Sequence, residues 1–163
     1  GAVVSKPHMD KILSYIELAR EEGGTILCGG RQVQVEGRCR DGWFVAPTVL
    51  EVLSHTCRTN QSEIFGPVVC VYGYDDLDQA VEQANALPVA FQAAVFTDDV
   101  DIANRMFKKL DATAVMINDH TAFRDDVMPF AGLRESGLGV GGIPDTMEDM
   151  QIDKMMVIKS TEL

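Results

Sequence analysis

Glu63 and Phe65 are the two residues whose types and spacing most directly suggest a binding function. They lie in the stretch Glu63-Ile64-Phe65-Gly66-Pro67, just before an apolar run that begins at Val68. A carboxylate accepts hydrogen bonds from hydroxyl groups, and a phenyl ring offers a flat apolar surface, so together they suit a ligand with both features. The alternative is that Glu63 is a solvated charge and Phe65 a core residue, which are the usual roles of these residue types.

His120 and Arg124 are further candidates, and each has a structural alternative. His120 follows the apolar run 114–117, so it either lines a site at the end of a strand or is an ordinary loop residue. The Arg124 guanidinium suits an anionic substrate group, but it can equally pair at the surface with Asp125 or Asp126. The other histidines share no spacing with them. His8 is expected to be a solvated helix residue and His55 a loop residue.

Residues 137–142 read Gly-Leu-Gly-Val-Gly-Gly and contain the spacing G-x-G-x-x-G of dinucleotide-binding loops. No strand pattern leads into this stretch, and too little chain follows for a strand-helix-strand unit with a ribose-binding acid. We therefore expect a tightly turned or flexible glycine loop here.

The cysteines favour neither a metal site nor redox chemistry. Cys28, Cys39, Cys57 and Cys70 are far apart, and none forms a Cys-x-x-Cys pair. We expect four reduced thiols, with Cys28 and Cys70 buried in strands as small apolar residues. No metal site and no catalytic cysteine is predicted in this chain.

Composition narrows the classes of partner. The 163 residues carry a formal net charge of −11, which disfavours nucleic acid and anionic membranes as partners. No apolar run approaches the roughly 20 residues needed to cross a bilayer, and no charged-then-apolar leader opens the chain. These features favour a cytoplasmic protein. The chain begins at Gly1 without an initiator methionine, so we expect a piece of a longer protein.

The first half of the sequence predicts one helix followed by short strands. Met9, Ile12, Leu13, Ile16 and Ala19 recur at helical spacing, and Gly23-Gly24 is a stop signal. The strands are expected at 25–28 and 32–35, and an extended run at 43–50.

The middle of the chain predicts alternating strands and helices. Strands are expected at 68–72, 93–96 and 114–117, with helices between them capped by Asp75 and by Thr97 or Asp98. This order predicts an α/β fold: an open parallel-type sheet built from βαβαβ units, with helices on both faces. A short helical stretch through Met150 and a final strand at 155–159 complete the chain.

Five motifs in order resemble those of the aldehyde dehydrogenase superfamily, and with the ending they cover nearly the whole chain. Residues 63–68 resemble its E-x-F-G-P-V signature, and residues 128–137 resemble its M-P-F-G-G-x-K-x-S-G. The remaining matches are 44–49, 93–97, 115–118 and the ending 148–158. The chain is thus similar to the C-terminal portion of such an enzyme: residues 1–150 from the catalytic domain, and 151–163 as a terminal strand for oligomerisation.

The resemblance implies roles for particular residues. Glu63 would accept hydrogen bonds from the nicotinamide ribose of NAD or NADP, and Phe65 would pack against the nicotinamide. Gly66 would allow the backbone to turn, and Pro67 would stiffen the entrance to the strand. Asn118, His120 and Phe130 would line the aldehyde pocket, although Asn118 is also suited to fixing a loop.

The departures from the family are equally informative. The family's nucleotide-binding domain, nucleophilic cysteine and activating glutamate lie upstream of the matched region, so this chain alone is predicted to be inactive. The full-length protein would oxidise an aldehyde to an acid through a cysteine thioester. Its terminal strand suggests a homo-oligomer, because an unpaired apolar edge is a liability unless it is covered. Small anionic aldehydes are suggested by the departures at 89–91, Ala131 and Arg134, together with the segment 118–124. The alternative function is a non-catalytic α/β interaction module.

Overall fold

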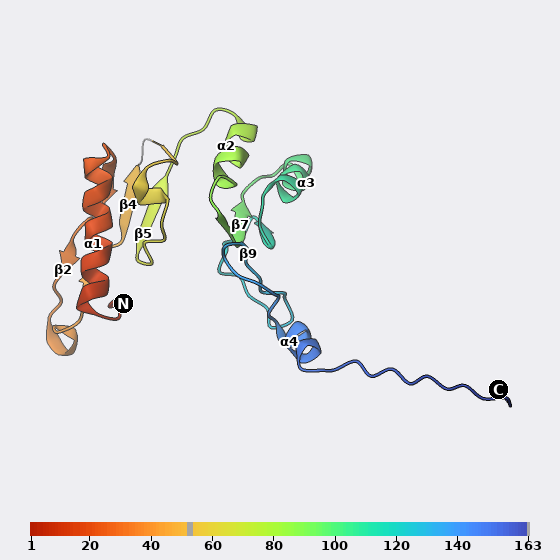
Figure 1. Cartoon of the computed structure of the whole chain (residues 1–163). Coiled ribbons are helices and arrows are strands. Elements are labelled where there is room, and N and C mark those ends of the chain that lie inside the picture. Colours follow the sequence, from red (N-terminus) through yellow and green to blue (C-terminus); the bar gives the residue numbers. More distant parts are fainter. Residues whose placement is uncertain (52–53, 163) are drawn as a thin grey trace. The chain divides into compact units, whose positions relative to one another are not determined.

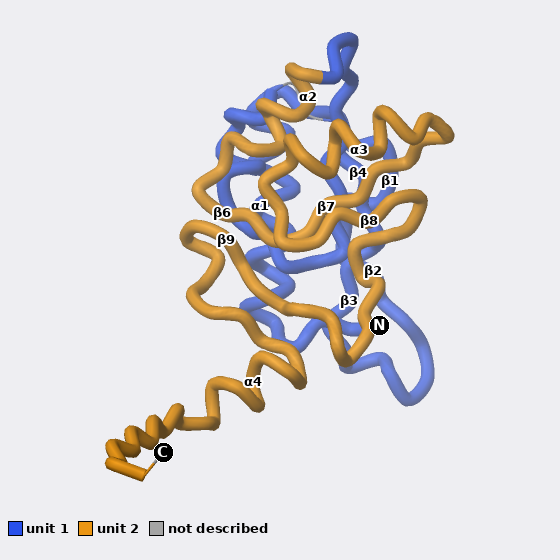
Figure 2. The backbone as a smooth tube through the Cα atoms, turned by 90° about the vertical axis from the view of Figure 1, so that its right-hand side faces the viewer, with its two compact units in different colours: residues 1–77 blue, residues 78–163 orange. Residues whose placement is uncertain are grey.

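The computed structural model describes residues 1–51 and 54–162, which fall into two compact units. The units are Gly1–Leu77 and Asp78–Leu163 (Figure 2). Both combine helices with short open sheets, so the predicted α/β class is confirmed.

The first unit is built around helix α1, Lys6–Glu21 (Figure 1). Ser5 is its N-cap, because its Oγ accepts a hydrogen bond from His8 N at 3.3 Å, and Pro7 lies in the first turn, where no backbone donor is needed. Gly23, with φ +84°, follows the C-terminal end. The buried face consists of the predicted apolar residues Met9, Ile12, Ile16 and Ala19.

A three-stranded sheet in the order β1-β4-β5 packs against α1. Its strands are β1 Thr25–Cys28, β4 Thr48–Glu51 and β5 Val68–Val71. β4 runs antiparallel to β1 and parallel to β5, with Thr48 opposite Val68. Along β5, Val68 and Cys70 point to the α1 side, whereas Val69 and Val71 are exposed. Helix α1 therefore covers one face of this sheet.

The predicted extended run at 43–50 forms two strands rather than one. β3, Phe44–Val45, pairs with β2, Gln32–Val33, and the chain then changes sheets at Pro47 to enter β4. Proline donates no backbone hydrogen bond, so a ladder cannot continue evenly through it. Short 3-10 helices flank these strands: η1 Gly37–Cys39 and η2 Arg58–Asn60. Cys28, expected to be buried, is exposed in β1.

The second unit contains one parallel strand-helix-strand unit. β7, Gln92–Val95, pairs in parallel with β8, Ala114–Ile117, and α3, Val100–Lys109, connects them. The cap of α3 is Asp99, not the predicted Thr97 or Asp98: its carboxylate accepts hydrogen bonds from Asp101 N and Ile102 N. Helix α2, Leu77–Ala84, is joined to α3 by Asp78, which pairs with Arg105 and Lys109.

The strands predicted near 68–72, 93–96 and 114–117 as one βαβαβ series are divided between the two units. β5 pairs with β4 within the first unit, and β7 pairs with β8 within the second. Apolar periodicity locates strands, but it does not identify their neighbours. Helix α2 begins at Leu77, so Asp76, and not the predicted cap Asp75, immediately precedes it.

The end of the chain contains a pairing that the sequence pattern did not reveal. β9, Leu133–Arg134, runs antiparallel to β6, Val89–Ala90. Arg134 fixes this region by donating hydrogen bonds to the carbonyls of Asn85 and Leu87 and by pairing with Asp111. The short helix α4, Ile143–Asp149, follows as expected.

Residues 151–162 form no strand within the monomer and are exposed throughout (Figure 1). The predicted strand at 155–159 therefore has no partner in the described chain, and Leu163 lies outside the described residues. Among those residues, no helix is long and apolar enough to cross a membrane.

Candidate functional site

The loop that carries Glu63 and Phe65 lies at the surface of the first unit, just before β5. Both side chains are exposed, and 69% of Phe65 is accessible to solvent. The expectation from residue type, a core phenylalanine, is therefore wrong. Phe65 also has φ +59°, a left-handed conformation that costs a residue with a Cβ about 1–2 kcal/mol. Strained backbone of this kind is common at binding sites.

Two side chains from α1 hold this loop by its backbone carbonyls. His8 Nε2 lies 2.7 Å from Phe65 O, and Lys11 Nζ donates a hydrogen bond to Glu63 O at 3.3 Å. The His8 and Phe65 rings lie 6.1 Å apart. His8 is therefore not the solvated helix residue expected from the sequence. The available signal was its position one turn before Ile12, on the side of α1 that meets the loop.

Gly66 is required by packing rather than by backbone conformation. The positive φ of the turn belongs to Phe65, not to Gly66 as the resemblance implied. A Cβ on Gly66 would lie 2.6 Å from Ile12 Cδ1, and Ile12 is fully buried. The next residue joins the loop to the sheet, because Pro67 O accepts a hydrogen bond from Thr48 N at 2.9 Å.

Glu22, at the end of α1, anchors the segment that leads into this loop. Its carboxylate accepts hydrogen bonds from Thr59 Oγ1 at 2.6 Å, Thr59 N at 3.0 Å and Arg58 N at 2.8 Å, and it lies 3.3 Å from Arg58 Nε. These bonds, the one from the Thr59 hydroxyl foremost, lower the pKa of Glu22 from 4.5 to about 2 despite partial desolvation. Glu22 thus fixes η2, three residues before Glu63.

We expect Glu22→Gln to lower the melting temperature near neutral pH, because the amide offers one acceptor oxygen where the carboxylate offers two. The folded state depresses the pKa of Glu22, so this stabilisation is present above pH 4.5 and is lost as the pH falls towards about 2. The melting curves of wild type and variant should converge over that range. Glu21→Gln, on the adjacent exposed residue, is the control. A constant difference down to about pH 2 would contradict the assignment.

In the second unit, Asn118 closes the carboxyl end of the β7–β8 pair. Its φ is +59°, its Oδ1 accepts a hydrogen bond from Thr97 N at 2.8 Å, and its Nδ2 donates to Thr97 O at 2.9 Å. The Asn118 side chain therefore bonds the backbone of Thr97 as a neighbouring strand residue would. These contacts favour the loop-fixing role over direct contact with a substrate.

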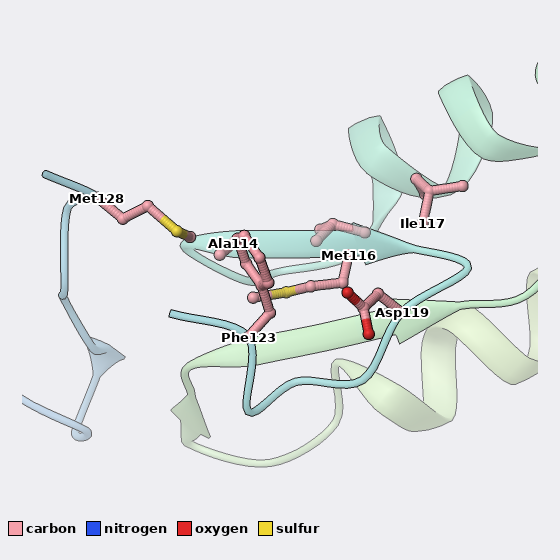
Figure 3. Close-up of a pocket in the computed structure, with 7 residues that line it drawn as sticks. Ala114, Met116, Ile117, Asp119, Phe123 and Met128 are labelled. Atoms are coloured by element: carbon pink, nitrogen blue, oxygen red, sulfur yellow. The ribbon is translucent and has the colours of Figure 1, made fainter. Parts of the chain in front are cut away.

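A pocket of about 310 Å³ lies beside β8 (Figure 3). Met116 and Asp119 border it, together with Phe123 and Met128 from the following loop; the other lining residues are Ala114, Val115 and Ile117. His120 does not line it and is exposed, although its backbone N donates to Asp119 Oδ1 at 2.8 Å. Sequence reasoning missed Asp119, which directly precedes His120.

Arg124 and Phe130 are brought together by the structure. The Arg124 guanidinium carbon lies 4.8 Å from the centre of the Phe130 ring, in the geometry of a cation–π contact. Phe91 packs edge-on against the same ring at 4.8 Å. Within the described chain, no ion pair joins Arg124 to Asp125 or Asp126. The surface pairing considered from the sequence is thus absent there. Arg124 Nη1 instead donates a hydrogen bond to Pro129 O at 3.5 Å.

The remaining sequence candidates form no site. Gly137, Gly139 and Gly142 all have positive φ and make a turned loop that ends at the seven-residue α4, as expected for a glycine loop. The described residues include no cluster of His, Cys, Asp or Glu suited to a metal ion. All four cysteines are free, and burial raises the pKa of the Cys70 thiol.

The profile described as the aldehyde dehydrogenase family matches residues 1–156. The chain belongs to the aldehyde dehydrogenase family. It is 38% identical over 140 residues to 4-trimethylaminobutyraldehyde dehydrogenase B of Danio rerio, an alignment that covers 85% of this chain and 27% of that protein.

Solved aldehyde dehydrogenase structures share the fold. Aldehyde dehydrogenase 21 from Physcomitrella patens, in complex with the reaction product succinate, superposes with a TM-score of 0.82 at 33% identity. The superposition covers 92% of this chain and 30% of the Physcomitrella patens chain. The NAD+ complex of an aldehyde dehydrogenase from Bacillus cereus gives a TM-score of 0.84 at 32% identity, over 91% and 29% of the two chains. This chain therefore spans less than a third of the length of these family members.

Proposed function

We propose that the complete protein oxidises an aldehyde to a carboxylic acid with NAD or NADP, and that this chain supplies the C-terminal portion of its catalytic domain. The proposal rests on one observation above all. In a member of the aldehyde dehydrogenase family, the exposed Glu63 and Phe65 are presented at the surface by a loop that α1 holds in a strained conformation.

Glu63 and Phe65 fit the nicotinamide half of the cofactor. The Glu63 carboxylate is exposed and accepts hydrogen bonds only, so it suits the two adjacent hydroxyls of a ribose. The Phe65 ring offers an exposed apolar face for a planar heterocycle. When bound, NAD or NADP supplies the acceptor of the hydride that leaves the aldehyde carbon. The residues of this chain orient that acceptor and exclude water from one side of it.

The nucleophile of the proposed reaction is supplied by the remainder of the protein. A reactive cysteine needs a lowered pKa and a neighbouring base or helix N-terminus. Cys70 has the opposite shift, and Cys28 and Cys39 are exposed. Cys57, which precedes η2, makes no side-chain hydrogen bond to that helix. Among the described residues, no hydrogen bond joins any of these four thiols to a histidine or a carboxylate. We therefore propose that this chain alone does not oxidise aldehydes.

The test compares the complete protein with residues 1–163 alone in an assay of NADH or NADPH formation with a panel of aldehydes. The complete protein should be active with at least one aldehyde, and the isolated chain should give no turnover. Turnover by the isolated chain would place a nucleophile within it. A complete protein that is inactive and binds both NAD and NADP poorly would favour the alternative function, a non-catalytic interaction module.

We propose that the substrate is a small aldehyde with an anionic group, and that Arg124 contacts this group. The guanidinium lies over Phe130 with no acidic partner among the described residues. We expect Arg124→Gln to lower kcat/KM about tenfold for anionic aldehydes, because one charge-assisted contact is lost. Neutral aldehydes of similar size serve as the control and should be affected less than about twofold. An equal loss for both classes would remove Arg124 from substrate recognition.

We also propose that residues 151–163 pair with a second copy of the protein. The described part of this tail exposes Ile152, Met155 and Val157, each more than four-fifths accessible. An unpaired apolar segment is a liability unless it is covered. Sedimentation of the complete protein with and without the tail tests this proposal, and an unchanged oligomer would contradict it. The same exposed tail is the feature that favours the alternative, a non-catalytic interaction module.

A further inference from the structure

His8 makes a contact for which neither the sequence motifs nor the proposed roles account. We propose that His8 is a positioning residue: it fixes the backbone of Phe65 and thereby the orientation in which the Phe65 ring meets the nicotinamide. This proposal rests on the proposed cofactor role of Phe65. It adds a residue from α1, 57 positions away in sequence, to the machinery that holds the cofactor.

The His8 ring is the donor in its contact with Phe65. His8 Nε2 lies 2.7 Å from Phe65 O, and a carbonyl oxygen can only accept, so Nε2 must carry the hydrogen. The other ring nitrogen, Nδ1, is buried and has no partner in the described structure. The ring is therefore committed to this one hydrogen bond, because its other polar atom is closed off from solvent.

His8 lies on a rigid part of α1. Its backbone N donates to the cap Ser5 Oγ, and the neighbouring Met9 and Ile12 are buried in the core. One turn further along, Lys11 Nζ reaches Glu63 O. The first two turns of α1 thus present donors from a packed helix to two carbonyls of the loop.

The hydrogen bond from His8 stabilises the left-handed conformation of Phe65. Phe65 has φ +59°, which a residue with a Cβ adopts only when its surroundings enforce it. Its ring is largely exposed, so side-chain packing does little of this enforcement. Contacts to the backbone must do it instead, and among the described residues the bond from His8 is a backbone contact made at Phe65 itself. Without a donor at this position, Phe65 is expected to relax towards negative φ and carry its ring away from the present orientation.

The experiment uses the complete protein with His8→Leu and His8→Gln, and with His55→Leu as a control on a histidine away from this contact. Glutamine retains an N–H donor at a similar reach, whereas leucine retains only bulk. We expect His8→Leu to raise KM for the cofactor and lower kcat/KM for it about five- to tenfold, the effect of about one hydrogen bond. His8→Gln should keep KM and kcat/KM for the cofactor within about twofold of wild type. The two variants should melt at similar temperatures, so that the kinetic difference between them does not come from stability.

Crystal structures of the same variants give a readout that does not depend on activity. Phe65 should keep its positive φ in His8→Gln and lose it in His8→Leu. An unchanged Phe65 backbone in His8→Leu would overturn the proposal, as would equal kinetic defects in the two variants. The proposed cofactor role of Phe65 is tested separately by Phe65→Ala. If Phe65 does not contact the cofactor, this variant leaves the cofactor kinetics unchanged, whatever the Phe65 backbone does in the His8 variants.

Discussion

Glu63→Gln in the complete protein is expected to lower kcat/KM for NAD or NADP by about 10- to 100-fold. The proposed role of this carboxylate is to accept hydrogen bonds from ribose hydroxyls, and bonds to a charged group contribute about 1.5–3 kcal/mol. Glutamine keeps the shape but loses the charge and one of the two acceptor oxygens. Steady-state kinetics with varied cofactor at saturating aldehyde measure the effect.

The fold should survive this substitution. Glu63 is exposed, and no hydrogen bond among the described residues uses its side chain, so the melting temperature is expected to stay within about 1 °C of wild type. Glu21→Gln, on an exposed residue at the end of α1, is the matched control and should leave cofactor kinetics unchanged. If Glu63→Gln behaves like the control, Glu63 does not contact the cofactor.

Gly66→Ala is expected to cause the largest loss of stability, about 1–3 kcal/mol. The added methyl group would lie 2.6 Å from Cδ1 and 2.7 Å from Cγ1 of Ile12, a residue with no exposed surface and therefore no free space to move into. Either α1 or the loop must shift. Because the same loop carries Phe65, cofactor binding should weaken together with stability. Thermal unfolding and cofactor titration measure the two effects.

A double substitution separates this clash from a general effect of alanine. Ile12→Val removes the Cδ1 methyl and on its own costs about 0.5–1.5 kcal/mol. Combined with Gly66→Ala it should cost less than the sum of the two single changes, because the smaller side chain makes room. Gly73→Ala is the control, since a Cβ there meets no atom within 4 Å. Strict additivity of the Gly66 and Ile12 changes would contradict the packing argument.

Local sequence patterns were sufficient for the helices and for most strands. The repeat of Met9, Ile12 and Ile16, with Gly23-Gly24 after it, identified α1. Strand pairing was less predictable. The apolar runs at β5 and β7 look alike in sequence, yet β5 pairs with β4 and β7 with β8. The two-residue β9 offered no periodicity at all.

The contacts that hold the loop of Glu63 and Phe65 were not predicted from the sequence, and the roles of these two residues stay a prediction. Glu63 and Phe65 were identified through the resemblance, whereas the left-handed conformation of Phe65 depends on contacts made across the fold. His8 and Glu22 reach residues 57 and 37 positions away, and no local pattern encodes such distances. In the second unit, Asn118 was considered both as a pocket residue and as a loop-fixing residue, and its bonds to Thr97 favour the latter.

The most direct test of the account is a crystal structure of the complete protein with NAD or NADP bound. We predict that the Glu63 carboxylate lies within about 2.6–3.2 Å of the hydroxyls of the nicotinamide ribose, with the Phe65 ring against the nicotinamide and its φ still positive. A cofactor bound in a productive position with Glu63 and Phe65 both facing solvent, or covered by an unrelated surface, would contradict the central claim.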